Sequence, residues 1–530
     1  MTPRGGKAVV IGAGFGGLAA AIRLRARGYD VTVLEALDQP GGRARVFRQD
    51  GFTFDAGPTV ITAPYLLDEL FALVGRDPRD YFTLSPVDPF YRILFHDGGS
   101  FDFVGDEERL IAQIRAMSPR DVDGYRQLAA KARAIFDVGY TKLADRPFDR
   151  LSTMLRVLPS MMRLESFRSV HGLVAKHIRD ERLRQVFSFE PLLVGGNPFR
   201  TTSIYLLIHW LERQWGVYYA RGGTGMIVQA LVKLLSEIGV EVRCNSPVER
   251  IEVRDQSVVG VMTASGEHLP ADVVVANGDP TTIYSRLIAA EQRPTMSDRR
   301  LARTRQSMSL FVGYFGTSRI YSELAHHTVV LGPRYKGLLD DVFERRVLAD
   351  DMSLYLHAPC RSDPAMAPPN HDAFYVLSPV PNTRSGIDWS ARRDEYFDRV
   401  LTQLEKRVLP GVRSSIVTSD MMTPDDFEHT LRSADGSAFG PEPLLTQSAW
   451  FRYHNRAPDI NGLYFVGAGT HPGAGVPGVL NSAKVLDRVV PAPSHAQHHL
   501  TERLVAREPL VRFADLTQLE DAINGRTNLT

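Results

Sequence analysis

One stretch near the N-terminus, Lys7 to Glu35, constrains the fold of this 530-residue chain more than any other. It begins with an apolar, β-branched run at residues 8–11, which has the composition of a buried parallel strand. The run ends in a turn that reads G-x-G-x-x-G, and a helical pattern follows and ends near Gly28. A second apolar strand, residues 31–34, leads into Glu35. This order predicts the first half of a Rossmann-like nucleotide-binding fold.

Each part of this stretch has a physical role in nucleotide binding. Gly12 permits the tight turn, Gly14 lets the backbone approach a pyrophosphate, and Gly17 lets the helix pack closely on the strand. Gly16 lies in the same turn, where free N–H groups and the positive end of the helix dipole attract phosphate. Glu35 can accept hydrogen bonds from ribose hydroxyls. A glycine-rich turn alone is weak evidence, but the agreement of all these parts favours a nucleotide site.

A Gly-Gly-Arg sequence follows the second strand. Gly41, Gly42 and Arg43 suit a loop that bends back over the nucleotide and brings Arg43 near phosphate charge. The alternative is an exposed arginine in an ordinary turn. The strength of the neighbouring motif favours the binding role.

A second glycine-rich loop lies near the other end of the chain. An apolar strand ends at Val466, the glycines that follow include Gly467, Gly469 and Gly475, and a helix is expected to begin near Val476. The free N–H groups of such a helix can face the pyrimidine edge of a flavin and stabilise the negative charge that forms there on reduction. An NAD domain needs no such loop, so the sequence predicts FAD.

The chain is too long for one hydrophobic core, and the nucleotide-binding fold is interrupted twice. We therefore expect an α/β protein with a discontinuous FAD-binding domain and two substrate-side domains. The expected boundaries are residues 1–63, 220–290 and 454–490 for the FAD-binding domain, 64–219 for a mostly helical substrate- and membrane-associating insertion, 291–453 for the substrate domain, and 491–530 for a C-terminal tail.

Charge and cysteine content exclude several classes of function. A net charge of +1 argues against a nucleic-acid partner. The two cysteines, Cys244 and Cys360, form neither a disulfide framework nor a zinc site, and they fit a reducing cytoplasm. His326, His327 and His357 do not form a recognisable ligand set, so we predict no metal and interpret them as loop or hydrogen-bonding residues. Neither a signal peptide nor a membrane-spanning apolar run is evident, so any membrane contact is expected to be peripheral.

Two parts of the insertion suggest contact with apolar molecules. Residues 149–164 combine bulky apolar side chains with arginines, and Pro159 is expected to kink the segment. The pattern is typical of a helix in a bilayer interface, or of a core-packed helix pair with a solvated basic edge. Residues 186–198 and 204–211 are apolar and aromatic, as in a tunnel wall or a core. His209 is expected to be a buried, hydrogen-bonded histidine rather than a base.

Together these stretches resemble the bacterial-type phytoene desaturases, carotenoid-forming members of the flavin-dependent amine-oxidase-like superfamily. The matching segments are residues 10–18, 51–62, 188–205, 324–335, 353–360, 445–456 and 466–479. The resemblance implies non-covalent FAD and stepwise dehydrogenation of phytoene to neurosporene or lycopene. By position it implies adenosine and diphosphate contacts at Gly12, Gly14, Gly17, Glu35, Gly42 and Arg43, an adenine contact at Val248, and flavin contacts at Gly467, Gly469, Gly475 and Val476.

The implied chemistry suits the residues. Phytoene is a hydrocarbon, so its binding must come from apolar burial, at roughly 25 cal/mol per Å². Hydride loss to the flavin and proton loss to a weak base need no elaborate catalytic constellation, and the sequence identifies no catalytic residue. His471 is a candidate base, although a structural role in a turn is favoured, and Arg156 is at most a lipid or tunnel-mouth contact. The expected partners are phytoene, a membrane surface, and oxygen or quinone as electron acceptor.

Three alternatives remain on the sequence alone. One is another carotenoid-modifying flavoprotein, such as a desaturase of hydroxylated or methoxylated carotenes or a saturase. A second is a soluble amine oxidase, against which the apolar segments around Leu192 and Leu206 argue. A third is a flavin-bearing, lipid-binding protein without catalytic activity.

Overall fold

The computed structural model describes residues 6–493 and is built around a five-stranded parallel sheet in the order β19-β13-β1-β2-β9. Three distant parts of the chain supply its strands, which are β1 (Lys7–Ile11), β2 (Asp30–Leu34), β9 (Glu241–Arg243), β13 (Val273–Ala276) and β19 (Leu463–Phe465). The FAD-binding half predicted from the sequence is therefore discontinuous. All but three residues of the predicted C-terminal tail lie outside the described part of the chain.

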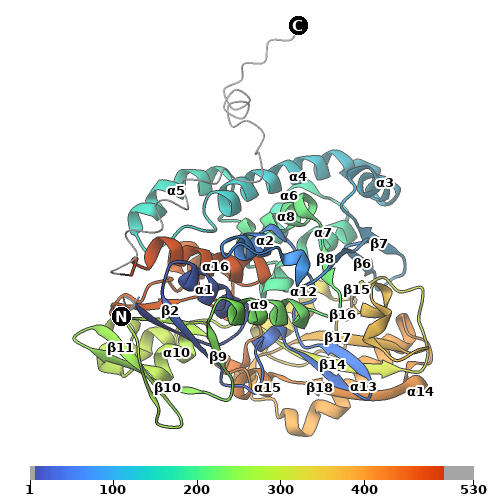
Figure 1. Ribbon diagram of the computed structural model, residues 1–530. Helices are drawn as coiled ribbons and strands as arrows, with labels where there is room; N and C mark the ends of the chain where they lie inside the picture. Colours follow the sequence, from blue (N-terminus) through green and yellow to red (C-terminus); the bar gives the residue numbers. More distant parts are fainter. Residues whose placement is uncertain (1–5, 494–530) are drawn as a thin grey trace.

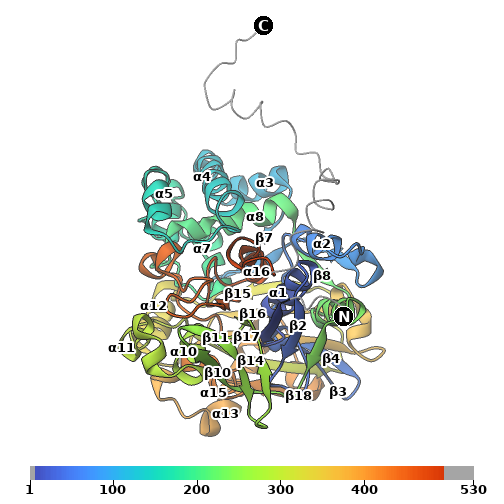
Figure 2. The same ribbon diagram turned by 60° about the vertical axis from the view of Figure 1, so that its left-hand side comes forward.

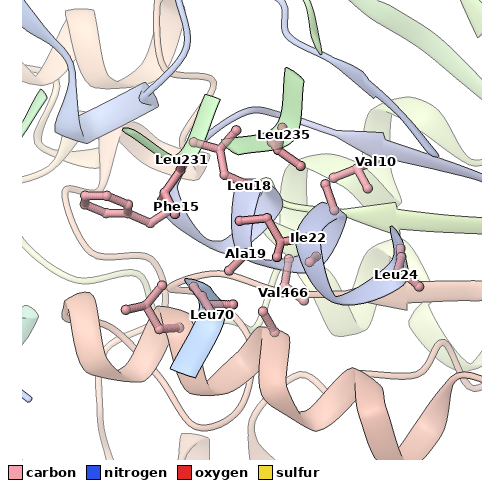
Figure 3. Packing of buried hydrophobic residues seen from close by; sticks show 14 of the residues in the cluster. Val10, Phe15, Leu18, Ala19, Ile22, Leu24, Leu70, Leu231, Leu235 and Val466 are labelled. Atoms are coloured by element: carbon pink, nitrogen blue, oxygen red, sulfur yellow. The ribbon is translucent and has the colours of Figure 1, made fainter. Parts of the chain in front are cut away.

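Both faces of this sheet are covered. One face packs against α1 (Phe15–Ala26), α9 (Gly225–Glu237) and α16 (Val476–Val489), and Figure 3 shows Leu18 and Ile22 of α1 within that core. The other face packs against an antiparallel sheet of β10 (Val248–Arg254), β11 (Ser257–Thr263) and β12 (His268–Pro270). Val10 belongs to the first core and Val9 to the second. A strand buried on both faces needs an apolar residue at each position, which explains the unbroken apolar run of β1.

A seven-stranded sheet lies on the substrate side, in the order β18-β14-β17-β16-β15-β6-β7. Five of its strands come from the predicted substrate domain, namely β14 (Ser309–Thr317), β15 (His327–Val330), β16 (Leu354–His357), β17 (Asp372–Val380) and β18 (Ile416–Met422). The other two, β6 (Tyr91–Leu94) and β7 (Ser100–Phe103), belong to the insertion that the sequence predicted to be mostly helical. The sequence analysis missed the alternating pattern of these strands. In β6, Tyr91 and Ile93 are buried, whereas Arg92 and Leu94 are only partly buried.

Apart from β5 (Leu84–Pro86), which pairs with β8 (Tyr218–Ala220) where the insertion ends, the rest of the insertion is mainly helical. Its helices include α2 (Tyr65–Ala72), α3 (Glu107–Met117), α4 (Val122–Phe136), α5 (Leu151–Arg163), α6 (Val170–His177), α7 (Glu181–Ser188) and α8 (Leu207–Trp215). In both views α3, α4 and α5 cover one end of the molecule, whereas β14 and β18 lie on the opposite side (Figure 1, Figure 2). Pro159 lies inside α5, and none of the side chains of this helix is buried. Among the described residues, no helix combines the length and apolar character needed to cross a bilayer.

Candidate active site

A cavity of about 650 Å³ joins the parallel sheet, the seven-stranded sheet and the helical layer. Both glycine-rich loops line it at the edge of the parallel sheet. Its other walls are mainly apolar, with side chains from the helical layer such as Val157, Leu193 and Ile208 and from the seven-stranded sheet such as Leu310 and Val329. One space therefore connects the predicted nucleotide site with an apolar chamber.

The first loop has the geometry that its glycines predict. Gly12 has a φ of +92°, which strongly favours glycine. A Cβ at Gly17 would lie 2.0 Å from the carbonyl oxygen of Gly12, so the helix approaches the strand as closely as only glycine allows. Gly14 is the N-cap of α1 and provides no side-chain cap. Gly12, Gly14 and Gly16 line the cavity, whereas Gly17 packs behind the loop.

Glu35, Gly42 and Val248 border the same end of the cavity. The carboxylate of Glu35 lies at the end of β2 and accepts hydrogen bonds from the backbone N–H of Ala13 at 2.7 Å and of Leu37 at 3.0 Å. These bonds fix the acidic side chain between the first turn and the second strand. Val248 begins β10 and is buried.

Arg43 and Asp279 bring opposite charges to the cavity wall. Burial lowers the pKa of Arg43, which the nearby charge of Asp279 partly offsets, and burial raises the pKa of Asp279. One terminal nitrogen of Arg43 donates to the hydroxyl of Ser433 at 2.7 Å, but its Nε and one carboxylate oxygen of Asp279 have no partner among the described residues. A partly buried cation with an unused donor beside the positive end of α1 suits a bound diphosphate. The residues present therefore fit the adenosine diphosphate part of FAD.

The second loop meets the first at this cavity. Gly467 and Gly469 follow β19, and Gly475 is the N-cap of α16, whose first residue is Val476. All four line the cavity, and α16 has no side-chain cap at its N-terminus. Helices α1 and α16 lie side by side (Figure 1). Two helix N-termini from opposite ends of the chain thus open into one space, as the sequence predicted.

Asn277 is a residue of this site that the sequence analysis missed. It follows β13, and its side-chain amide donates to the carbonyl oxygen of Gly12 at 3.3 Å. The same side chain lies against Gly16 and Gly467, so it links the two loops. A polar residue at the carboxyl end of a buried parallel strand is the signal that points to such a role.

The histidines singled out in the sequence have different surroundings. His209 is fully buried and its Nε2 lies 3.3 Å from the hydroxyl of Tyr125, in line with the prediction of a hydrogen-bonded core histidine. His471 lines the cavity, where burial lowers its pKa to about 4 and keeps it neutral. His326 lies in a bend just before β15, His327 in β15 and His357 in β16, and each forms a hydrogen bond, in line with the interpretation as loop or hydrogen-bonding residues. The three rings are not scattered, however, but come together in the interior.

Comparisons with known proteins identify the family of the chain. Residues 15–485 match the family of flavin-containing amine oxidoreductases. The chain is 51% identical over 481 residues to a lycopene-forming phytoene desaturase of Pseudescherichia vulneris, with 90% of this chain and 97% of the relative covered. It is 45% identical over 492 residues to a neurosporene-forming phytoene desaturase of Rhodobacter capsulatus, with 92% and 94% covered.

Solved structures show the same fold at low sequence identity. An oxidoreductase from Methanosarcina mazei superposes with a TM-score of 0.63 at 17% identity, and 91% of this chain and 100% of that chain are covered. A redesigned putrescine oxidase superposes with a TM-score of 0.62 at 14% identity, and 91% and 97% of the two chains are covered.

Proposed function

Because the chain belongs to the phytoene desaturases within the flavin-containing amine oxidoreductases, we propose that it dehydrogenates phytoene stepwise to neurosporene or lycopene. It is an FAD-dependent oxidoreductase that acts on CH–CH groups. The observation that carries the proposal is the apolar chamber that continues directly from the glycine-rich loops. A hydrocarbon offers no group for ionic or hydrogen-bonded recognition, so an apolar wall of this kind is what its binding requires.

We propose that the predicted cofactor residues hold FAD at the two loops. Gly12, Gly14, Gly16, Gly17, Glu35, Gly42, Arg43 and Val248 would hold the adenosine diphosphate, and Gly467, Gly469, Gly475 and Val476 would surround the flavin. Support comes from their position, since all except Gly17 line one cavity and Gly17 fixes the turn from behind. Asn277 and Asp279 would complete the site.

Bound FAD supplies the hydride acceptor for this chemistry. The apolar walls hold a saturated carbon pair beside the conjugated part of the substrate and exclude water, which favours one orientation of the long molecule. After the hydride leaves, the adjacent carbon loses a proton, and the residual electron pair forms the new double bond. The helix N-terminus of α16 favours negative charge at the end of the site where its N–H groups point.

The product profile in a phytoene-accumulating host tests the proposal. We expect coloured carotenes with more conjugated double bonds than phytoene, and chromatography will show whether neurosporene or lycopene is the end product. A host that makes FAD-loaded protein but leaves phytoene unchanged contradicts the proposal. Conversion only of added hydroxylated or methoxylated carotenes instead supports the related desaturase activity.

We also propose that the protein binds to a membrane surface through α5. Leu151, Leu155, Leu158 and Met162 are between 43% and 61% exposed on its outer side, while Met161 on its inner side lines the cavity. A helix with apolar side chains on both faces suits a position between lipid and the substrate chamber. The exposed Arg156 and Arg163 suit lipid headgroups. The cytoplasmic location, and oxygen or quinone as final electron acceptor, stay predictions.

A further inference from the structure

A hydrogen-bonded chain leaves the substrate chamber beside Thr59 and Tyr355, which both line the cavity. The hydroxyl oxygen of Thr59 lies 2.7 Å from that of Tyr355. The hydroxyl oxygen of Tyr355 lies 2.7 Å from Nδ1 of His327 on its other side. Tyr355 therefore connects the space where carbon chemistry takes place to a buried imidazole.

Three imidazoles continue the chain. His327 in β15 and His357 in β16 are opposite each other in the strand register, and one ring nitrogen from each of His326, His327 and His357 lies within 4.8 Å of the other two. Nε2 of His357 is 3.0 Å from Nε2 of His326, and Nδ1 of His326 is 2.7 Å from the hydroxyl of Ser362. Ser362 is partly exposed, so this path of hydrogen-bonding groups ends at the protein surface. Among the described residues, no direct hydrogen bond joins His327 to the other two rings, and a single water can bridge nitrogens that lie up to 4.8 Å apart.

The surroundings keep these imidazoles neutral. Burial lowers the pKa of His326 to about 3, to which the charge of Arg361 contributes, and it lowers the pKa of His327 and of His357 well below the ordinary value. A neutral imidazole has one N–H donor and one acceptor nitrogen, so it can take a proton on one side and release another on the opposite side. Nε2 of His327 and Nδ1 of His357 have no hydrogen-bonding partner among the described residues. An additional proton is therefore disfavoured on each of the three rings, and these two nitrogens are available to pass it on.

We propose that Tyr355, His327, His357 and His326 form a relay that carries the proton of each dehydrogenation from the substrate chamber to the surface at Ser362. The inference rests on the proposed function. In each round one C–H bond loses its hydride to FAD, and the neighbouring C–H bond gives up its proton while its electron pair becomes the double bond. The proton passes to the hydroxyl oxygen of Tyr355 as the hydroxyl proton of Tyr355 passes to Nδ1 of His327. Each later link receives one proton and passes one on, so solvent gains one proton per double bond.

Two variants interrupt the relay at different links. Tyr355→Phe removes the hydroxyl that faces the chamber. His327→Asn keeps an acceptor near the position of Nδ1 but removes Nε2. Tyr396→Phe is the matched control, because it also removes a tyrosine hydroxyl that is hydrogen-bonded in the interior, at 2.8 Å from that of Ser378, whereas Tyr396 belongs neither to the cavity wall nor to the path from Thr59 to Ser362.

The experiment mixes each FAD-loaded protein with phytoene liposomes without oxygen in weak buffer. It follows flavin bleaching and, with an indicator dye, the release of protons, in H₂O and in D₂O. For the wild type and Tyr396→Phe we expect one proton per flavin reduced and a solvent isotope effect on proton release. For Tyr355→Phe and His327→Asn we expect at least about tenfold slower release and loss of the normal isotope effect, at unchanged FAD content.

The outcomes separate this inference from the proposed function. If phytoene bleaches the flavin of the wild type normally, and the Tyr355→Phe and His327→Asn variants release protons as fast as Tyr396→Phe, the relay alone is overturned. If phytoene does not bleach the flavin of the wild-type protein, the proposed function is overturned and the relay with it. A stoichiometric transition metal in the purified holoenzyme that is lost in His327→Asn also overturns the relay, because a metal would occupy the imidazole lone pairs.

Discussion

At the scale of single residues, the close approach of Gly17 to Gly12 makes the first loop sensitive to a single methyl group. In Gly17→Ala the added carbon would lie 2.0 Å from a backbone oxygen, so the helix must move away from the strand and distort the phosphate-binding turn. We expect the affinity for FAD to fall at least about tenfold, or about 1.4 kcal/mol in binding, seen as less FAD in the absorbance of the purified protein. Gly172→Ala in α6 is the control, because its Cβ would meet only the rotatable hydroxyl of Ser169. Equal FAD content in the two variants would contradict the prediction.

A second prediction at this scale concerns pH. Asp55 is buried at the end of β4 (Phe52–Asp55) and accepts a hydrogen bond from the backbone N–H of Thr224 at 2.6 Å. Burial raises its pKa from 3.8 to about 7, so between these values the folded state binds more protons than the unfolded state. The contribution of this protonated carboxyl group to the free energy of unfolding is fully present below pH 3.8 and is lost as the pH rises through about 7.

Asp55→Asn removes this titration. We expect its denaturation midpoint to depend less on pH between 5 and 7.5 than that of the wild type, with a difference in unfolding free energy of at most roughly 4 kcal/mol across the full range. Asp97→Asn, at an exposed position, should keep the wild-type slope. The same slope in all three proteins would show that Asp55 does not titrate in this range.

Which residues the sequence reveals depends on how local their signals are. The glycines and Glu35 lie in one short motif, and the structure places them as the motif predicts, around one turn. Asn277, Thr59 and Tyr355 belong to separate strands and loops, and only tertiary packing brings them to the cavity. The same holds for His326, His327 and His357, which looked scattered because β15 and β16 must pair before their rings meet.

At the scale of whole elements, α5 predicts how the protein reaches its substrate. Leu155→Ser with Leu158→Ser replaces two side chains of its exposed outer face and leaves the cavity side unchanged. Each leucine contributes roughly 1.5 kcal/mol when buried in lipid, so we expect liposome binding in a flotation assay to fall at least about tenfold. Ile320→Ser with Val417→Ser removes equally exposed apolar side chains elsewhere and should bind like the wild type. Equal loss in both double variants would argue against α5 as the docking element.

Long apolar runs and helix starts could be predicted from the sequence, whereas short strands between helical segments could not. The apolar runs of β1 and β2 and the helix starts of α1 and α16 agree with the sequence analysis. The strands β6 and β7 each contain four residues between helices, so their alternation is too short to stand out locally. The two strands pair with each other, and the pairing of β6 with β15, far along the chain, joins them to the larger sheet.

At the scale of the whole molecule, the cavity joins parts of the chain that lie more than 400 residues apart, Gly12 and Gly475 among them. A ligand that contacts both loops should therefore stabilise the entire fold. We expect FAD at about 100 times its Kd to raise the unfolding free energy by about 2.7 kcal/mol, seen as a higher midpoint in thermal unfolding. Riboflavin lacks the diphosphate and adenosine, so at the same concentration it should stabilise the protein much less. Equal shifts for both ligands would mean that the first loop contributes no binding.

The seven-stranded sheet takes two of its strands, β6 and β7, from the insertion, and this limits how the protein can be re-engineered. A shortened version without residues 64–219 would lose β6 and β7. The hydrogen-bonding edge of β15 would then be exposed, and an unpaired edge strand promotes self-association. Chimaeras that exchange chambers between relatives must therefore transplant these strands together with the helices. A swap designed on the helices alone would cut through a continuous sheet.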